Sequence, residues 1–117
     1  MPTTTTTDDW TFSASINGMN FNKPTSTSMG LGVGAAATAV SGETQCTGVG
    51  YASLASSRSG ANNTAVGYGT LNNATTAHSN TAIGAGTLLN NVAGTDATAV
   101  GFMALYSNTG SRSTAVK

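Results

Sequence analysis

Charged residues are scarce in this 117-residue sequence, with four Lys or Arg and four Asp or Glu giving a formal net charge of zero. The charged fraction of 7 % lies far below the roughly 25 % of ordinary globular domains, which excludes a coiled coil and a typical enzyme surface. With so few cations there is no basic stripe, so no binding to nucleic acid is expected. Disorder is also disfavoured, because disordered chains are usually rich in charge.

Long apolar runs are missing as well. None approaches the roughly 18 to 20 residues that a transmembrane helix needs, so no membrane insertion is expected. Residues 1–9 show no basic segment followed by an apolar one, so no secretory signal is expected either. The single cysteine, Cys46, cannot form an intrachain disulfide, and we expect it to be a small apolar filler.

Small and short polar residues make up most of the chain. Thr, Ala, Gly, Ser and Asn together account for 78 of the 117 residues. A low-complexity chain of this kind needs another source of order, and repetition supplies it.

A short repeat runs through most of the sequence. The pattern Thr-(Ala/Gly)-(Val/Ile)-Gly begins at positions 47, 64, 81 and 98, which gives a 17-residue period, and a leucine follows at the same distance in each copy. One unit upstream, Leu31-Gly32-Val33-Gly34-Ala35 fits the same template, and a sixth copy begins at Thr114. We therefore divide the chain into an N-terminal tail, hairpin and linker over 1–30 and a repeat domain over 31–117.

These short units predict an all-β parallel β-solenoid of about five coils of 16–17 residues. Two helices do not fit in so short a unit, and Gly, Asn, Ser and Thr are poor helix formers. Stacked coils place identical residues about 4.8 Å apart, and Thr and Asn columns can then hydrogen-bond along the stack. The glycine column marks a corner that needs positive φ or close backbone approach. The expected core columns are Val33, Val49, Val66, Ile83 and Val100 with Leu54, Leu71, Leu88 and Leu105, and the expected corner glycines are Gly34, Gly50, Gly67, Gly84 and Gly101.

One chain alone is expected to be marginal. Burying two apolar anchors per coil contributes only about 3–6 kcal/mol, whereas ordering the backbone and side chains of one coil costs on the order of 20 kcal/mol or more. Alanines such as Ala65, Ala82 and Ala99 allow close approach of identical faces, and the scarcity of charge removes repulsion between them. The sequence therefore predicts a homotrimer around a threefold axis.

The runs at residues 63–71 (NTAVGYGTL) and 80–88 (NTAIGAGTL) resemble the head repeats of trimeric autotransporter adhesins. Similar repeats occur in fibre and decoration proteins of tailed bacteriophages. The resemblance covers residues 31–117 and implies a left-handed parallel β-roll, three chains side by side and no enzymatic chemistry. The signal peptide, stalk and membrane anchor of autotransporters are not recognisable in the sequence.

The N-terminal segment does not repeat. Its apolar residues alternate on both sides of Asn17-Gly18, which predicts a β-hairpin with a type I′ turn. Two interpretations of its apolar face stay open: it caps the base of the solenoid and helps trimer formation, or it docks onto a larger assembly. The residues of this face are Trp10, Phe12, Ile16, Met19 and Phe21.

Catalytic chemistry has little support. His78 is the only histidine, and we expect it to be a solvated side chain in a turn. No second His, Cys or paired carboxylate joins it or Asp96 at the spacing of a metal site. The Gly-rich run at residues 30–34 lacks the Lys-Ser/Thr of a phosphate-binding loop. We expect no catalytic residue, no metal, no cofactor and no enzyme activity.

Three functions follow as hypotheses. The first is a short trimeric capsid decoration (cement) spike on a bacteriophage virion, made in the host cytoplasm and attached by its N-terminal segment to the major capsid protein or another virion protein. The second is an adhesive fibre module, in a phage tail fibre or a bacterial surface adhesin, that binds a receptor or host-surface glycan. The candidate surface aromatics of this module are Tyr51, Tyr68, Phe102 and Tyr106. The first three share one repeat column and can instead simply cover the glycine corner.

The third hypothesis, a remote one, is ice binding through the Thr column. It is disfavoured because the residue two positions on is Val or Ile and is expected to face inward.

Overall fold

The described residues form one ladder of short strands. The structure, a computed structural model, describes residues 15–16, 19–22, 28–35, 45–57 and 59–117, and these contain no helix. Within them, eight strands form one sheet in chain order. The strands are β1 (Ser15–Ile16), β2 (Met19–Asn22), β3 (Met29–Leu31), β4 (Thr47–Val49), β5 (Thr64–Val66), β6 (Thr81–Ile83), β7 (Thr98–Val100) and β8 (Thr114–Val116).

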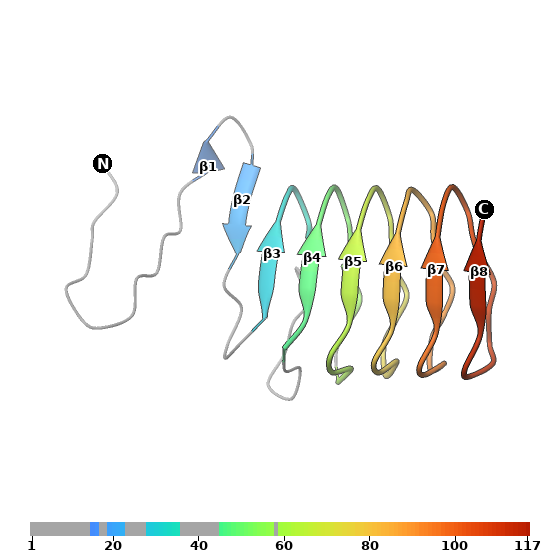
Figure 1. Cartoon of the computed structure of the whole chain (residues 1–117). Coiled ribbons are helices and arrows are strands. Elements are labelled where there is room, and N and C mark those ends of the chain that lie inside the picture. Colours follow the sequence, from blue (N-terminus) through green and yellow to red (C-terminus); the bar gives the residue numbers. More distant parts are fainter. Residues whose placement is uncertain (1–14, 17–18, 23–27, 36–44, 58) are drawn as a thin grey trace.

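Strands β3 to β8 are parallel and in register, so that Thr64 pairs with Thr81 and Val66 with Ile83. In Figure 1 the chain runs up each strand, crosses a corner at the top and returns behind the sheet to begin the next strand. The six strands enclose five turns. This is the parallel β-solenoid that the 17-residue period predicts.

A second set of backbone hydrogen bonds joins the returning runs behind the sheet. In three coils the amide of the core leucine donates to a carbonyl of the next coil, so that these coils are joined at the back as well as through the front strands. The bonds are Leu54 N to Thr70 O (3.0 Å), Leu71 N to Thr87 O (3.1 Å) and Leu88 N to Ala104 O (3.0 Å).

The leucine column forms the centre of the core, as predicted. Leu54, Leu71 and Leu88 are fully buried, and Leu105 of the last turn packs against them while partly exposed. All four have a left-handed backbone, with φ between 49° and 53°. A left-handed conformation costs a non-glycine residue roughly 1–2 kcal/mol, so the packing of each leucine has to exceed that cost.

The β-branched column is not in the core, and this prediction is wrong. Because side chains alternate along a strand, a three-residue strand directs its middle residue to one side and its two outer residues to the other. In β5 and β6 the middle residues, Ala65 and Ala82, are fully buried, whereas Val66 is 36 % exposed and Ile83 42 %. The same alternation places Val49 and Val100 on the outside, half-buried. The alanines therefore lie inside each coil and do not form a face for close approach between chains.

The first coil has a different register from the predicted one. Met29 pairs with Thr47 and Leu31 with Val49, so this coil is one residue longer than the next, and its outward apolar residue is Leu31 rather than Val33. Val33 lies two positions further on, after the corner glycine Gly32, and is exposed. The sequence misleads here because Leu31-Gly32 and Val33-Gly34 both resemble the end of a repeat strand.

The corner glycines are confirmed in four of the five predicted positions. Gly50, Gly67, Gly84 and Gly101 have φ between 118° and 135°, and a Cβ on Gly50 would lie 2.6 Å from the carbonyl oxygen of Gly67. Such positions exclude any side chain. In the first coil the corner position is held by Gly32, with φ 130°, whereas Gly34 lies beside Ala52 in another column.

The N-terminal edge of the solenoid is paired. Strand β2 runs antiparallel to β3, with Phe21 opposite Leu31, and β1 runs antiparallel to β2. The predicted turn at Asn17-Gly18 lies outside the described residues. So do Trp10, Phe12 and the side chains of Ile16, Met19 and Phe21, on which the predicted docking face depends.

Candidate functional site

The outer side of the parallel sheet is a flat surface made of two columns. We call it the Thr/Val face, and it lies on the front of the solenoid in Figure 1. Neighbouring residues within a column are about 4.8 Å apart, and the two columns are about 6.7 Å apart. Apart from Met29 at its start, the first column is threonine throughout, and the second column is aliphatic. Its residues are Met29, Thr47, Thr64, Thr81, Thr98 and Thr114 in one column and Leu31, Val49, Val66, Ile83, Val100 and Val116 in the other.

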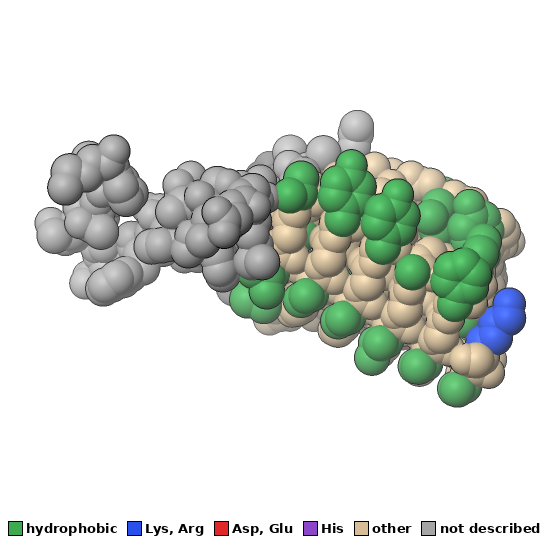
Figure 2. Space-filling view, turned by 90° about the horizontal axis from the view of Figure 1, so that it is seen from above, with side chains coloured by type: hydrophobic (Ala, Val, Ile, Leu, Met, Phe, Trp, Pro, Cys, Tyr) green, Lys and Arg blue, Asp and Glu red, His purple; other side chains and the backbone are tan. Residues whose placement is uncertain are grey.

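A second exposed column lies at the corner that follows the sheet. It contains Val33, Tyr51, Tyr68, Ala85 and Phe102, one from each coil, and we call it the corner column. The rings of Tyr51 and Tyr68 are stacked, with centroids 5.4 Å apart and planes 9° from parallel. Figure 2 shows both the corner column and the aliphatic column as series of hydrophobic side chains crossing the same side of the molecule.

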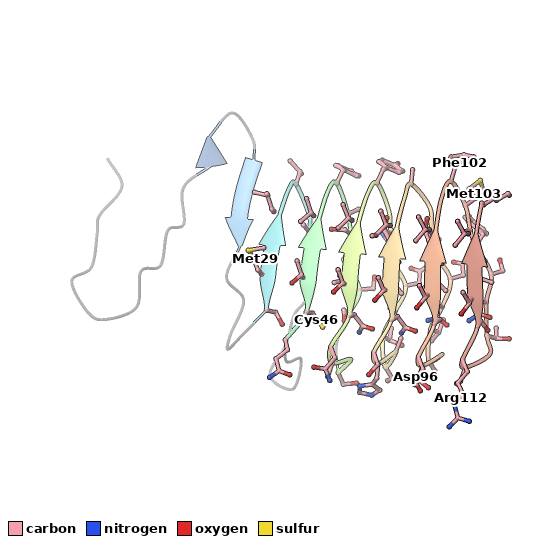
Figure 3. The ribbon with its side chains drawn as sticks, in the orientation of Figure 1. Met29, Cys46, Asp96, Phe102, Met103 and Arg112 are labelled. Carbon is pink, nitrogen blue, oxygen red and sulfur yellow. The ribbon has the colours of Figure 1, made fainter. Side chains whose placement is uncertain are left out.

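The predicted aromatics do not all belong together. The structure brings Tyr51, Tyr68 and Phe102 into the corner column, as the repeat alignment predicts. Tyr106 instead lies on the returning run, where its ring reaches over Gly86 beside Met103. In Figure 3, Phe102 and Met103 lie along the upper edge of the solenoid, whereas Asp96 and Arg112 lie along its lower edge.

Two buried asparagines, Asn63 and Asn80, form hydrogen bonds from coil to coil inside the solenoid. The side-chain oxygen of Asn63 accepts hydrogen bonds from the backbone and side-chain amides of Asn80 (3.0 and 3.1 Å), and that of Asn80 accepts from Ala97 N (3.0 Å). Their amide groups donate to Ala77 O (2.6 Å) and Gly94 O (2.9 Å). The expected hydrogen bonding of asparagines along the stack is thus confirmed, and these side chains have a structural role.

The remaining reactive residues are His78, Asp96 and Cys46, of which His78 and Asp96 lie in neighbouring coils with Asp96 N donating to His78 O at 3.1 Å. His78 is exposed, as predicted, and its Nδ1 accepts a hydrogen bond from Ala61 N at 3.1 Å. Asp96 is exposed in the next coil, and Cys46 is buried with its sulfur 3.6 Å from Gly60 O. Within the described ranges, no three His, Cys, Asp or Glu side chains come together as metal ligands.

The part of the chain that the structure describes has no helix long and apolar enough to cross a bilayer. Comparison of the chain with protein-family models, with curated proteins and with solved structures found no match.

Proposed function

We propose that this protein is a non-enzymatic structural protein of a virion, a short trimeric decoration spike attached to the capsid through its N-terminal segment. The observation that supports the proposal best is the Thr/Val face. It is flat, regular and uncharged, and it exposes an aliphatic side chain on every coil.

The trimer interface is assigned to this face. Burying the exposed part of one Val or Ile contributes roughly 0.5–1 kcal/mol, and the contribution recurs on each coil of each chain. When three such faces pack around one axis, the aliphatic columns of all three chains are removed from water. The neighbouring Thr hydroxyls donate and accept hydrogen bonds, so they can pair across the interface without any charge being buried.

The attachment to a particle is assigned to the N-terminal segment. Strand β2 pairs with β3, which joins this segment to one end of the stack. The apolar residues predicted to dock, from Trp10 to Phe21, are in this segment. A capsid protein is therefore the proposed partner at this end, with no role for a nucleic acid or a membrane.

The trimer is tested by native mass measurement at micromolar concentration, where a complex of three 11.5 kDa chains is expected. Ile83→Asp and Val66→Asp place a charge on the proposed interface and are expected to give monomers with an unchanged β-type circular dichroism spectrum. Thr109→Asp adds the same charge at an exposed position outside the face and is the control. A monomeric wild type, or an Ile83→Asp variant that stays trimeric, would contradict the assignment.

The attachment is tested by deleting residues 1–14, which removes Trp10 and Phe12 but keeps β1 and β2, so that the N-terminal edge of the sheet stays paired. The shortened chain is expected to remain folded and trimeric but to lose binding to purified particles. On particles carrying the full chain, density at threefold or quasi-threefold positions of the capsid supports decoration, whereas density at the tail tip contradicts it and supports a receptor-binding fibre.

Ice binding is a second candidate, because the β-branched column faces outward and not inward as predicted, although its residues are Val or Ile instead of Thr. Val66, Ile83 and their equivalents face outward, so each strand presents two regular ranks to the solvent instead of one. A thermal-hysteresis measurement tests this function. A monomer that shows hysteresis supports ice binding over the trimer, since one face cannot be both buried and in contact with ice, and a null result removes this candidate.

A further inference from the structure

The corner column has a gap between its aromatic side chains. Tyr68 is 64 % exposed and Phe102 68 %, and the residue between them is Ala85. We propose that this gap binds one neutral hexopyranose ring of a glycan, held between the faces of Tyr68 and Phe102. The inference goes beyond the proposed trimeric spike, because it concerns a different surface.

The spacing of the coils fits one inserted ring. Tyr68 and Phe102 are two coils apart, which corresponds to about 10 Å along the stack. A ring midway between them lies about 5 Å from each, within the roughly 4.5–7 Å range of stacked rings. The Tyr51–Tyr68 pair, at 5.4 Å and 9°, shows that neighbouring positions of this column do hold rings in a parallel stack.

The floor of the gap is almost free of side chains. It consists of the half-buried Gly84 and Ala85, so a single methyl group separates a ligand from the backbone, whereas Gly86 is buried. Behind it, Met103 and Tyr106 cover Gly86, with Met103 Cγ 3.3 Å and the Tyr106 ring 3.8 Å from where a Cβ on that glycine would lie. The gap therefore lies between two exposed aromatic residues, over a floor with one methyl group and beside one apolar wall.

The charge around the gap favours a neutral ligand. Asp96 and Arg112 lie at the opposite end of the coils (Figure 3). Among the described residues, the cation near this corner is Lys117, which follows the last strand and contacts Gly101. It lies beyond Phe102 along the stack and not beside the gap. A phosphate or carboxylate ligand finds no cation on the floor, whereas the CH face of a pyranose needs only an aromatic surface.

The test is a titration of the full chain with galactose, glucose and N-acetylglucosamine, followed by NMR of the Ala85 methyl group and the Tyr68 and Phe102 rings. We expect millimolar binding of at least one sugar, with shifts confined to these groups. Phe102→Ala removes one stacking face and is expected to weaken binding roughly three- to tenfold. Ala85→Tyr fills the gap with a side chain that the column already holds in two other coils, and is expected to abolish binding.

Tyr51→Ala is the control, because Tyr51 lies on the far side of Tyr68 and does not border the gap. Absence of shifts with all three sugars, or shifts that persist in Ala85→Tyr, would overturn the proposal. Shifts at Ala85 with phenol but with no sugar would overturn it in favour of an aromatic side chain of a protein partner. Ile83→Asp is expected to bind sugar as the wild type does, so failure of the trimer and failure of the sugar site are separable.

Discussion

The front and the back of the coils bury different kinds of apolar side chain. In the coils that begin with β5 and β6, the small alanine of the front points inward and the larger Val or Ile points outward, whereas the leucine of the back, Leu71 or Leu88, is fully buried. Strand alternation fixes the front, because only the middle residue of three can face the interior. The difference shows that the size and hydrophobicity of a residue do not by themselves decide which side of a thin coil it occupies.

The largest expected effect is on the back of the coil. Leu88→Ala leaves a cavity at a fully buried site and is expected to lower the free energy of unfolding by about 2–5 kcal/mol, measured by urea denaturation. Leu89→Ala removes the same atoms from the half-buried neighbouring residue and is the matched control. Equal losses in the two variants would mean that Leu88 is not the anchor of its coil.

An intermediate effect is expected from Ala82→Val. Two methyl groups added inside a filled coil are expected to cost about 1–3 kcal/mol through strain, although the change increases hydrophobicity and strand propensity. Thermal unfolding followed by circular dichroism measures it. A valine that stabilises the protein at this position would show that the interior has unused space.

The smallest effect on a single chain is expected from Ile83→Thr. The side chain is 42 % exposed and its replacement is small and β-branched, so the loss is expected to stay below about 1 kcal/mol in a sample dilute enough to be monomeric. In a concentrated sample the same substitution is expected to reduce trimer stability further. A large loss in the dilute sample would place Ile83 in the core after all.

Much of the fold is predictable because the repeat fixes which residues are equivalent. The 17-residue period yields the stack, the Leu54–Leu105 column and four corner glycines without any knowledge of handedness or cross-section. The repeat does not predict in the same way which residues of the front strand point into the coil and which point out. Thr-Ala-Val is compatible with either orientation, since alanine is acceptable both inside and outside.

The two candidate sites also differ in how far the sequence predicts them. The column of Tyr51, Tyr68 and Phe102 is visible in the aligned repeats, and so is its interruption at Ala85, although only the structure shows how exposed the rings are. The Thr/Val face is not predicted from the sequence, because the β-branched pattern assigns its aliphatic half to the core. A comparison of side-chain volumes gives the missing signal: an interior that takes one leucine per coil from the back leaves room only for alanine from the front.

The antiparallel pairing of β2 with β3 gives the stack a closed end. A head-to-tail contact between two solenoids would need the free edge of β3, and β2 already occupies part of it at Gly30 and Leu31. Because every link of a filament requires that same edge, blocking it on each chain stops linear polymerisation at the first step. Growth of a filament through the β3 edge is thereby prevented, even though every coil is a template for the next.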